Sequence, residues 1–184
     1  MTVALICIDF IHEIIHPSGK LAAKGYAAFV ERHKSFEKLA VRQSAVRSDG
    51  GRLIHVCLAF AQDYADHPAN SPLLGGARAA GILKEGTQSS AIYGPVAPLE
   101  GELVLQKKRI SAFHGTSLEI ALRSAKITKI VLAGVATDLA VQSAARDAHD
   151  RDFVVGIAAD SCIAASDEDH DAALRNMAKF ATIL

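Results

Sequence analysis

Three parts of this chain combine residue types that could form a hydrolytic site. Asp9 ends an apolar run that begins at Val3, a partly buried position where a carboxylate needs a partner. Lys108 follows the apolar residues 103–105 and could supply that partner. The segment 134–141 follows the apolar run 129–133 and has the pattern of a strand that leads into a helix. Because backbone N–H groups at a helix start are unpaired and lie at the positive end of the helix dipole, they can hold a developing oxyanion. Together these parts indicate acyl-transfer chemistry.

The two adjacent lysines are predicted to differ in role. Side chains on a strand alternate between faces, so Lys107 and Lys108 must point in opposite directions. We expect Lys108 to face Asp9, and Lys107 to be solvated or packed against a helix. The structural alternative for Asp9 and Lys108 is a buried ion pair that only ties two strand ends together.

Hydrophobic patterning predicts strands that alternate with helices. Short, nearly continuous apolar runs suit parallel strands covered on both faces, and they occupy residues 3–8, 53–58, 103–105, 129–133, 153–158 and 181–184. Helical spacing is found in residues 26–46, 117–125, 138–148 and 167–177, with one short helix expected near residues 74–80. This order predicts an α/β fold, a three-layer α/β/α sandwich around a mostly parallel, doubly wound sheet of about six strands. We expect one domain over residues 1–184.

Strand ends bring the candidate residues together. In an open parallel sheet, ligands bind outside the carboxyl ends of the strands, near the switch in strand order. Asp9, Lys108 and the segment 134–140 all lie at such ends, so they are predicted to converge. The long stretch 60–101 holds four of the five prolines and is expected to be mostly loop that shapes a pocket.

Composition excludes several classes of function. Twenty lysines and arginines balance twenty aspartates and glutamates, and no basic stripe suggests nucleic-acid binding. The N-terminal apolar run is too short for a spanning helix and ends at Asp9, so no membrane partner is predicted. An odd number of cysteines, all in apolar runs, indicates core thiols and a cytoplasmic location; they are Cys7, Cys57 and Cys162.

The ordered motifs resemble those of the isochorismatase-like hydrolases. The resemblance rests on ICIDF (6–10), ANSPL (69–73), KRISAFHGT (108–116) and GVATD (134–138) with ARDA (145–148). Amidases of the cysteine hydrolase branch use an Asp-Lys-Cys triad, and the resemblance implies Asp9 and Lys108 for its first two members. The cysteine falls at Ala140, whose methyl group cannot attack a carbonyl. Either the natural protein lacks the nucleophile or a cysteine was changed to alanine.

The same resemblance suggests residues that contact substrate. It places Val135, Ala136 and Leu139 at the site, with a cis peptide bond between Val135 and Ala136 that aims N–H groups inward. His12 and His16 follow Asp9 in a loop that could line the pocket, where an imidazole could orient water or bind a substrate carbonyl; the alternative for both is packing in a surface loop.

Two aromatic residues are further candidates for the site, and one polar cluster is considered as a metal site. Phe60 and Phe113 are candidates for apolar walls, with ordinary core packing as the alternative. Nicotinamidase relatives carry an Asp-x-His metal pair, but residues 63–67 read DYADH and lack that spacing. No metal and no cofactor are therefore predicted.

The sequence thus predicts a hydrolase of a small polar molecule that bears a carbonyl, amide or enol-ether group. Asp9 and Lys108 would be the working pair and water the nucleophile. Isochorismatases proper need no cysteine, because the aspartate protonates an enol ether. The alternatives are an amidase inactivated by a Cys-to-Ala change, and a non-catalytic member that binds a small ligand or serves in an assembly. The resemblance also implies a homo-oligomer, a dimer or tetramer.

Overall fold

A computed structural model describes residues 3–184 and contains one six-stranded sheet in which every strand pairing is parallel. The strands are β1 (Val3–Ile8), β2 (Arg52–Leu58), β3 (Leu103–Lys107), β4 (Lys129–Gly134), β5 (Val154–Ile157) and β6 (Thr182–Ile183). Their order in the sheet is β3-β2-β1-β4-β5-β6. The predicted doubly wound α/β architecture is confirmed.

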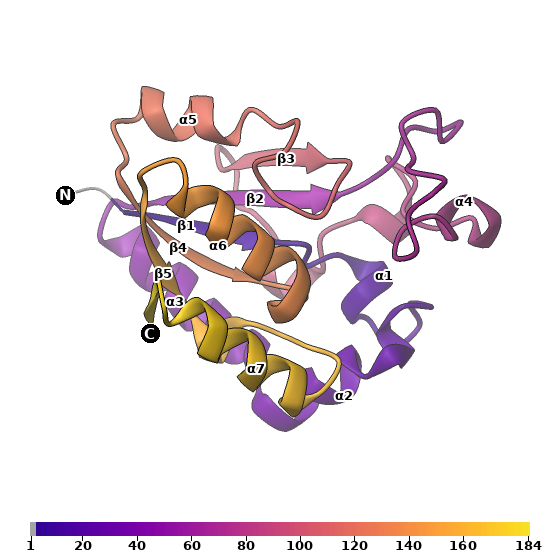
Figure 1. Ribbon diagram of the computed structural model, residues 1–184, viewed down its shortest axis with the longest axis horizontal. Helices are drawn as coiled ribbons and strands as arrows, with labels where there is room; N and C mark the ends of the chain where they lie inside the picture. Colours follow the sequence, from indigo (N-terminus) through magenta and orange to yellow (C-terminus); the bar gives the residue numbers. More distant parts are fainter. Residues whose placement is uncertain (1–2) are drawn as a thin grey trace.

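Helices cover both faces of the sheet. The helices α2 (Tyr26–His33) and α3 (Ser35–Ser48) pack on one face, and α5 (Leu118–Ser124), α6 (Gln142–His149) and α7 (Asp167–Met177) pack on the other. Figure 1 shows α6 and α7 in front of the strands and α3 behind them. None of the helices within residues 3–184 is long and apolar enough to cross a membrane.

Alternation along the strands divides the core into two halves. On β1, Leu5 and Cys7 join the half that includes Phe29 and Leu39 of α2 and α3. The intervening residues of β1 belong to the other half of the core, which includes side chains of α5, α6 and α7. Both faces of β1 are therefore apolar, which explains why its sequence is a continuous run.

Several helices differ from the prediction. The helical pattern over residues 26–46 divides at Lys34, whose φ of 54° is left-handed and ends α2. A short helix, α1 (His12–Ile15), forms where a loop was expected, and α4 (Ala77–Ala80) is shorter than predicted. The expected helix over 138–148 starts with a wide turn, η4 (Thr137–Val141), before α6 begins.

The switch in strand order lies at β1. From β1 the chain moves outward to β2 and β3, and then crosses to β4 on the other side of β1. The carboxyl ends of β1 and β4 therefore border the crevice where ligands bind in such sheets. Gly134 lets the two strand ends approach closely, since a Cβ there would lie 2.8 Å from Cβ of Ile8. Figure 1 shows α1 and α4 beyond these carboxyl ends.

The short helix η1 (Ala22–Lys24) follows α1 and ends at Gly25. The surroundings of Gly25 lead to a prediction about the stability of a glycine-to-alanine variant. Gly25 has a φ of 114°, and a Cβ there would collide with the carbonyl of Ala165. Gly50 also has a positive φ, 68°, but faces open space. We expect Gly25→Ala to lower the free energy of unfolding by about 1–3 kcal/mol more than Gly50→Ala, because only the first adds a collision to the strain. Urea denaturation of both variants tests this, and equal losses would contradict it.

Candidate active site

Asp9 lies where β1 ends and the chain turns. Its φ of 57° is left-handed, a conformation that aspartate tolerates better than most residues. The side chain is only 3% exposed, and Oδ1 accepts a 2.7 Å hydrogen bond from the backbone N–H of Leu58, at the end of β2. The carboxylate is thus held between the ends of two adjacent strands.

Lys107, and not Lys108, is the partner of Asp9. Nζ of Lys107 lies 2.7 Å from Oδ2 of Asp9, and the lysine side chain is 1% exposed. The same ammonium donates to the carbonyl oxygens of Arg109, at 3.1 Å, and Ile110, at 2.8 Å. All three of its protons therefore have acceptors, as a buried ammonium requires.

The prediction for Lys108 was wrong. Its ammonium lies 3.0 Å from a carboxylate oxygen of Asp66 and 3.6 Å from one of Glu85, in a partly exposed cluster. Burial alone would raise the pKa of Asp66, but the N–H of Ala61 and the ammonium of Lys108 hold that pKa below its ordinary value. Lys108 therefore belongs to a loop contact outside the pair.

The prediction assigned the wrong one of the two adjacent lysines to the side of the strand that faces Asp9. The two lysines do point in opposite directions, as predicted, but the expected strand 103–105 is apolar throughout and does not show which direction is inward. Strand β3 extends to Lys107, which is level with Leu58. Period-two alternation puts Lys107 on the side of the core residue Leu105 and puts Lys108 on the side of Gln106. That comparison was the available signal.

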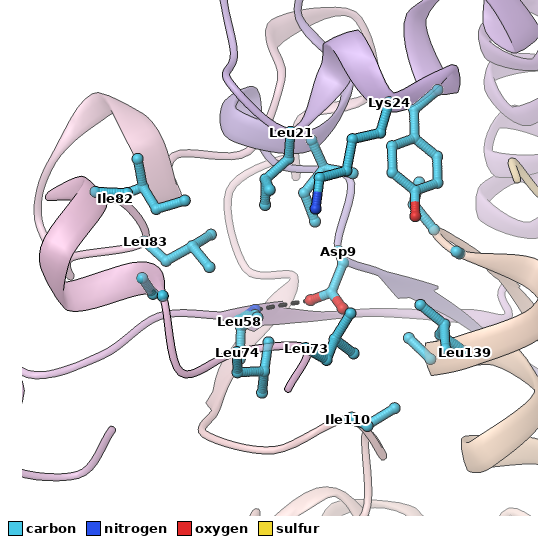
Figure 2. A pocket seen from close by; sticks show the side chains of 18 of the residues that line it. Asp9, Leu21, Lys24, Leu58, Leu73, Leu74, Ile82, Leu83, Ile110 and Leu139 are labelled. Carbon is cyan, nitrogen blue, oxygen red and sulfur yellow. Dashed lines mark hydrogen bonds between the residues drawn. The ribbon is translucent and has the colours of Figure 1, made fainter. Parts of the chain in front are cut away.

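The Asp9–Lys107 pair lies in the wall of a cavity of about 340 Å³. Figure 2 shows Asp9 at its centre, with Lys24 and Leu21 above it, Ile82 and Leu83 on one side and Leu139 on the other. Leu73 and Leu74 come from the long loop after β2, and the structure thus confirms that this loop shapes the pocket. The cavity is within the size range of small-molecule sites and mostly apolar, with few polar groups.

The segment after β4 forms another part of the wall. Val135, Ala136, Leu139 and Ala140 all line the cavity, and the peptide bond between Val135 and Ala136 is cis, as expected. Ala140 is 4% exposed and belongs to η4. Within the described residues the backbone N–H of Ala136 donates to no protein acceptor. A donor therefore remains available on a residue that faces the cavity.

The cavity wall lacks a conventional nucleophile. Among its lining residues in the described chain there is no cysteine, serine or threonine. Cys7, Cys57 and Cys162 are buried elsewhere, and burial raises the pKa of all three thiols, to about 12 for Cys7 and Cys162. Thiols of this kind are neutral and inaccessible at ordinary pH.

Three residues expected to contact substrate lie outside the cavity lining. His12 stacks on His16 with ring centroids 4.1 Å apart, and Nε2 of His12 lies 3.2 Å from Nε2 of Gln88, so His12 does not line the cavity. Phe60 and Phe113 are buried in separate halves of the core, the packing alternative for each. The sequence reasoning missed Lys24, which lines the cavity from η1.

The polar residues 63–67 form loop contacts. Asp66 accepts a hydrogen bond from the N–H of Ala61, and Nε2 of His67 lies 3.0 Å from the carbonyl oxygen of Gly75. In residues 3–184, no three His, Cys, Asp or Glu side chains are grouped so that they could hold a metal ion.

Burial controls the protonation of Asp9. Desolvation raises the pKa of Asp9 above its ordinary value, although Lys107 and the Leu58 N–H both favour the charged form. A carboxylate with a raised pKa is a stronger base when ionised and an available acid when protonated. Asp9, which lines the cavity, therefore has the properties of a candidate acid or base.

The fold and the site define an α/β protein with a small-molecule cavity at the switch point of its sheet. Residues 3–184 match the isochorismatase domain model, and the chain belongs to the isochorismatase family. It is 30% identical over 169 residues to the uncharacterized isochorismatase family protein YecD of Escherichia coli O157:H7. This alignment covers 90% of this chain and 74% of YecD. It is 32% identical over 153 residues to maleamate amidohydrolase of Pseudomonas putida, which covers 82% of this chain and 67% of that enzyme.

Structural comparison supports the same assignment. A crystal structure of an isochorismatase family protein from Desulfovibrio vulgaris superimposes with a TM-score of 0.88 at 25% identity. The match covers 99% of this chain and 93% of the other. The similarity thus includes the whole sheet and both helical layers.

The two adjacent lysines allow a matched test of the ion pair. Lys107→Met leaves a buried carboxylate without its counter-charge, and we expect a loss of about 3–5 kcal/mol in the free energy of unfolding. Lys108→Met removes a partly exposed pair and is expected to cost about 0–1 kcal/mol. Because Lys107 lowers the pKa of Asp9, its removal raises that pKa further; protonation then relieves the unpaired carboxylate as the pH falls, and the loss in Lys107→Met should shrink. Urea denaturation at several pH values measures the free energy of unfolding of both variants. Similar losses in Lys107→Met and Lys108→Met would contradict the assignment of Lys107 as the partner of Asp9.

Proposed function

We propose that this protein is a hydrolase of a small molecule with a carbonyl, amide or enol-ether group, and that Asp9 acts on the substrate with water as the nucleophile. The observation that carries the proposal is the buried Asp9–Lys107 pair, 2.7 Å apart, in a cavity wall without cysteine, serine or threonine in the described chain. The similarity to a maleamate amidohydrolase supports an amide substrate. Lys107 takes the role that the sequence suggested for Lys108.

For an amide, Asp9 would act as a general base. Its carboxylate takes a proton from water, the hydroxide oxygen bonds to the carbonyl carbon, and the carbonyl π electrons move to oxygen. The free N–H of Ala136 is a suitable donor to that oxyanion. When the tetrahedral intermediate collapses, the C–N bond breaks and Asp9 returns the proton to the leaving nitrogen. No bond to the protein forms, which agrees with a methyl group at Ala140.

For an enol ether, Asp9 would act as a general acid. The raised pKa favours this second route, because it keeps a larger fraction of the carboxyl protonated. Asp9 donates its proton to the terminal alkene carbon, water adds to the resulting oxocarbenium carbon and returns a proton to Asp9, and the hemiketal then breaks its C–O bond. Lys107 stabilises the carboxylate that forms during the first step.

Asp9→Asn tests the role of the carboxyl group in both routes. We expect kcat/KM to fall by about 100-fold or more, because the amide cannot exchange the proton. The assay panel contains maleamate, small carbamates and ureas, and a vinyl ether. Lys108→Met is the control and should keep its activity. An Asp9→Asn protein that is folded by circular dichroism and fully active would contradict the proposal.

The pH profile of the wild-type protein distinguishes the routes. If Asp9 is the base, kcat/KM rises with pH through the raised pKa of Asp9; if Asp9 is the acid, kcat/KM falls over the same range. A profile without this ionisation would exclude Asp9 from proton transfer.

Ala140→Cys tests whether only the nucleophile is missing for covalent catalysis. A thiol at Ala140 would lie in the cavity wall with Asp9, which could take its proton. We expect amidase activity and an acyl-enzyme mass adduct on the panel, while the wild-type protein forms no adduct. Cys162→Ala in the Ala140→Cys background is the control, because Cys162 is buried away from the cavity and should not carry the adduct. An adduct on the wild-type protein would contradict hydrolysis by water alone, and a folded but unreactive Ala140→Cys would favour the enol-ether route.

A further inference from the structure

We infer that Lys24 is the specificity-determining residue of this cavity and binds an anionic group, such as a carboxylate, on the substrate. The inference rests on the proposed function, which places the reacting group of the substrate at Asp9. It concerns the other end of the same substrate molecule. The chemical class is therefore a small monoanion with an apolar body.

The balance of charge in the cavity supports this assignment. The charged residues that line it, among those described, are Asp9, Lys24 and Lys107. Asp9 and Lys107 neutralise one another, and the Lys107 ammonium is also saturated by two backbone carbonyls. The ammonium of Lys24 has no ion pair and no hydrogen bond within residues 3–184. One positive charge therefore remains for a ligand.

The position of Lys24 matches this role. In Figure 2 its side chain extends from η1 into the view of the pocket, and its nitrogen points toward Asp9 without being joined to it. Both residues line the same cavity, and Asp9 forms its ion pair with Lys107 and not with Lys24. A molecule held by its anion at Lys24 would present its other end to Asp9.

The backbone that carries Lys24 is fixed. Ala22, at the start of η1, is 1% exposed, and Gly25 follows Lys24 in close contact with the Ala165 carbonyl. The nearby Lys20 differs, because its ammonium donates a 2.7 Å hydrogen bond to the carbonyl oxygen of Ala80 and so joins this segment to α4. The ammonium of Lys20 thus has a structural contact, whereas no such contact is found for the ammonium of Lys24 among the described residues.

The apolar side chains that line the rest of the cavity indicate that the part of the ligand between its two ends is apolar. Leucine and isoleucine side chains surround the space between Lys24 and Asp9, among them Leu21, Leu58, Leu83, Ile110 and Leu139. These aliphatic side chains offer no hydrogen bonds, and apart from the charged residues Tyr26 is the polar side chain of the lining among the described residues, so a second charge or a hydroxylated chain would find few partners. The volume of about 340 Å³ is at the small end of the range for ligand sites.

Crotonate and crotonamide test the inference, because they share one carbon skeleton and differ in charge. Calorimetric titration should show that the wild-type protein binds crotonate about tenfold more tightly than crotonamide, as expected for a charge-assisted hydrogen bond to an exposed lysine. Lys24→Met should remove that preference and leave crotonamide binding unchanged, whereas Lys24→Arg should keep it. Lys38→Met, on the exposed side of α3, is the matched control and should bind as the wild type does.

The outcomes separate this inference from the proposed function, since the titration requires no turnover. A lost preference in Lys24→Met supports the inference even if no panel compound is hydrolysed. Equal binding of the two ligands by the wild type, or an unchanged preference in Lys24→Met, overturns it even if Asp9 proves catalytic. With an active substrate, the effect of Lys24→Met should appear in KM and not in kcat.

Discussion

The buried ion pair between Asp9 and Lys107 is the contact on which the site depends. Removing two charges from water is expensive, and the cost is offset only when geometry is good and every remaining donor is paired. Here β1 supplies the carboxylate, β2 supplies the Leu58 N–H, and β3 supplies the lysine at the register position of Leu58. Two carbonyls beyond β3 accept the other ammonium protons. A change in the register of β3 would therefore break the pair, so the sheet and the site are mutually dependent.

The pair also determines what the rest of the cavity can do. Since Lys107 is saturated, its charge holds Asp9 and is not available to recognise a ligand. We infer that recognition comes from Lys24 and the apolar wall, and we propose that proton transfer comes from Asp9. In this proposal the two lysines of the cavity have separate tasks: Lys107 holds Asp9 inside the protein, and Lys24 binds the ligand.

The sequence predicted the fold better than the site. Continuous apolar runs located all six strands; for the central strands the reason is that strands buried on both faces cannot be polar. Strand ends then placed Asp9 and Ala140 on one cavity, as expected. Lys107 was missed because an apolar strand does not show which of its sides faces inward, and Lys24 because a lysine in a loop has no distinctive pattern. His12, Phe60 and Phe113 were misplaced since their orientation depends on tertiary packing that no local spacing determines.

Stability alone does not account for the Asp9–Lys107 pair. Well-packed apolar residues of similar volume often stabilise a protein as well as a buried ion pair, or better. The neighbouring wall shows that leucine and isoleucine fit this region, yet the charged pair lies on the cavity with its carboxylate held at a raised pKa. Desolvated carboxylates with a specific charge partner in a cleft are typical of functional sites. Because Ala140 provides no nucleophile, the chemistry that such a pair can still perform is proton transfer to water or to the substrate, and both proposed routes use it.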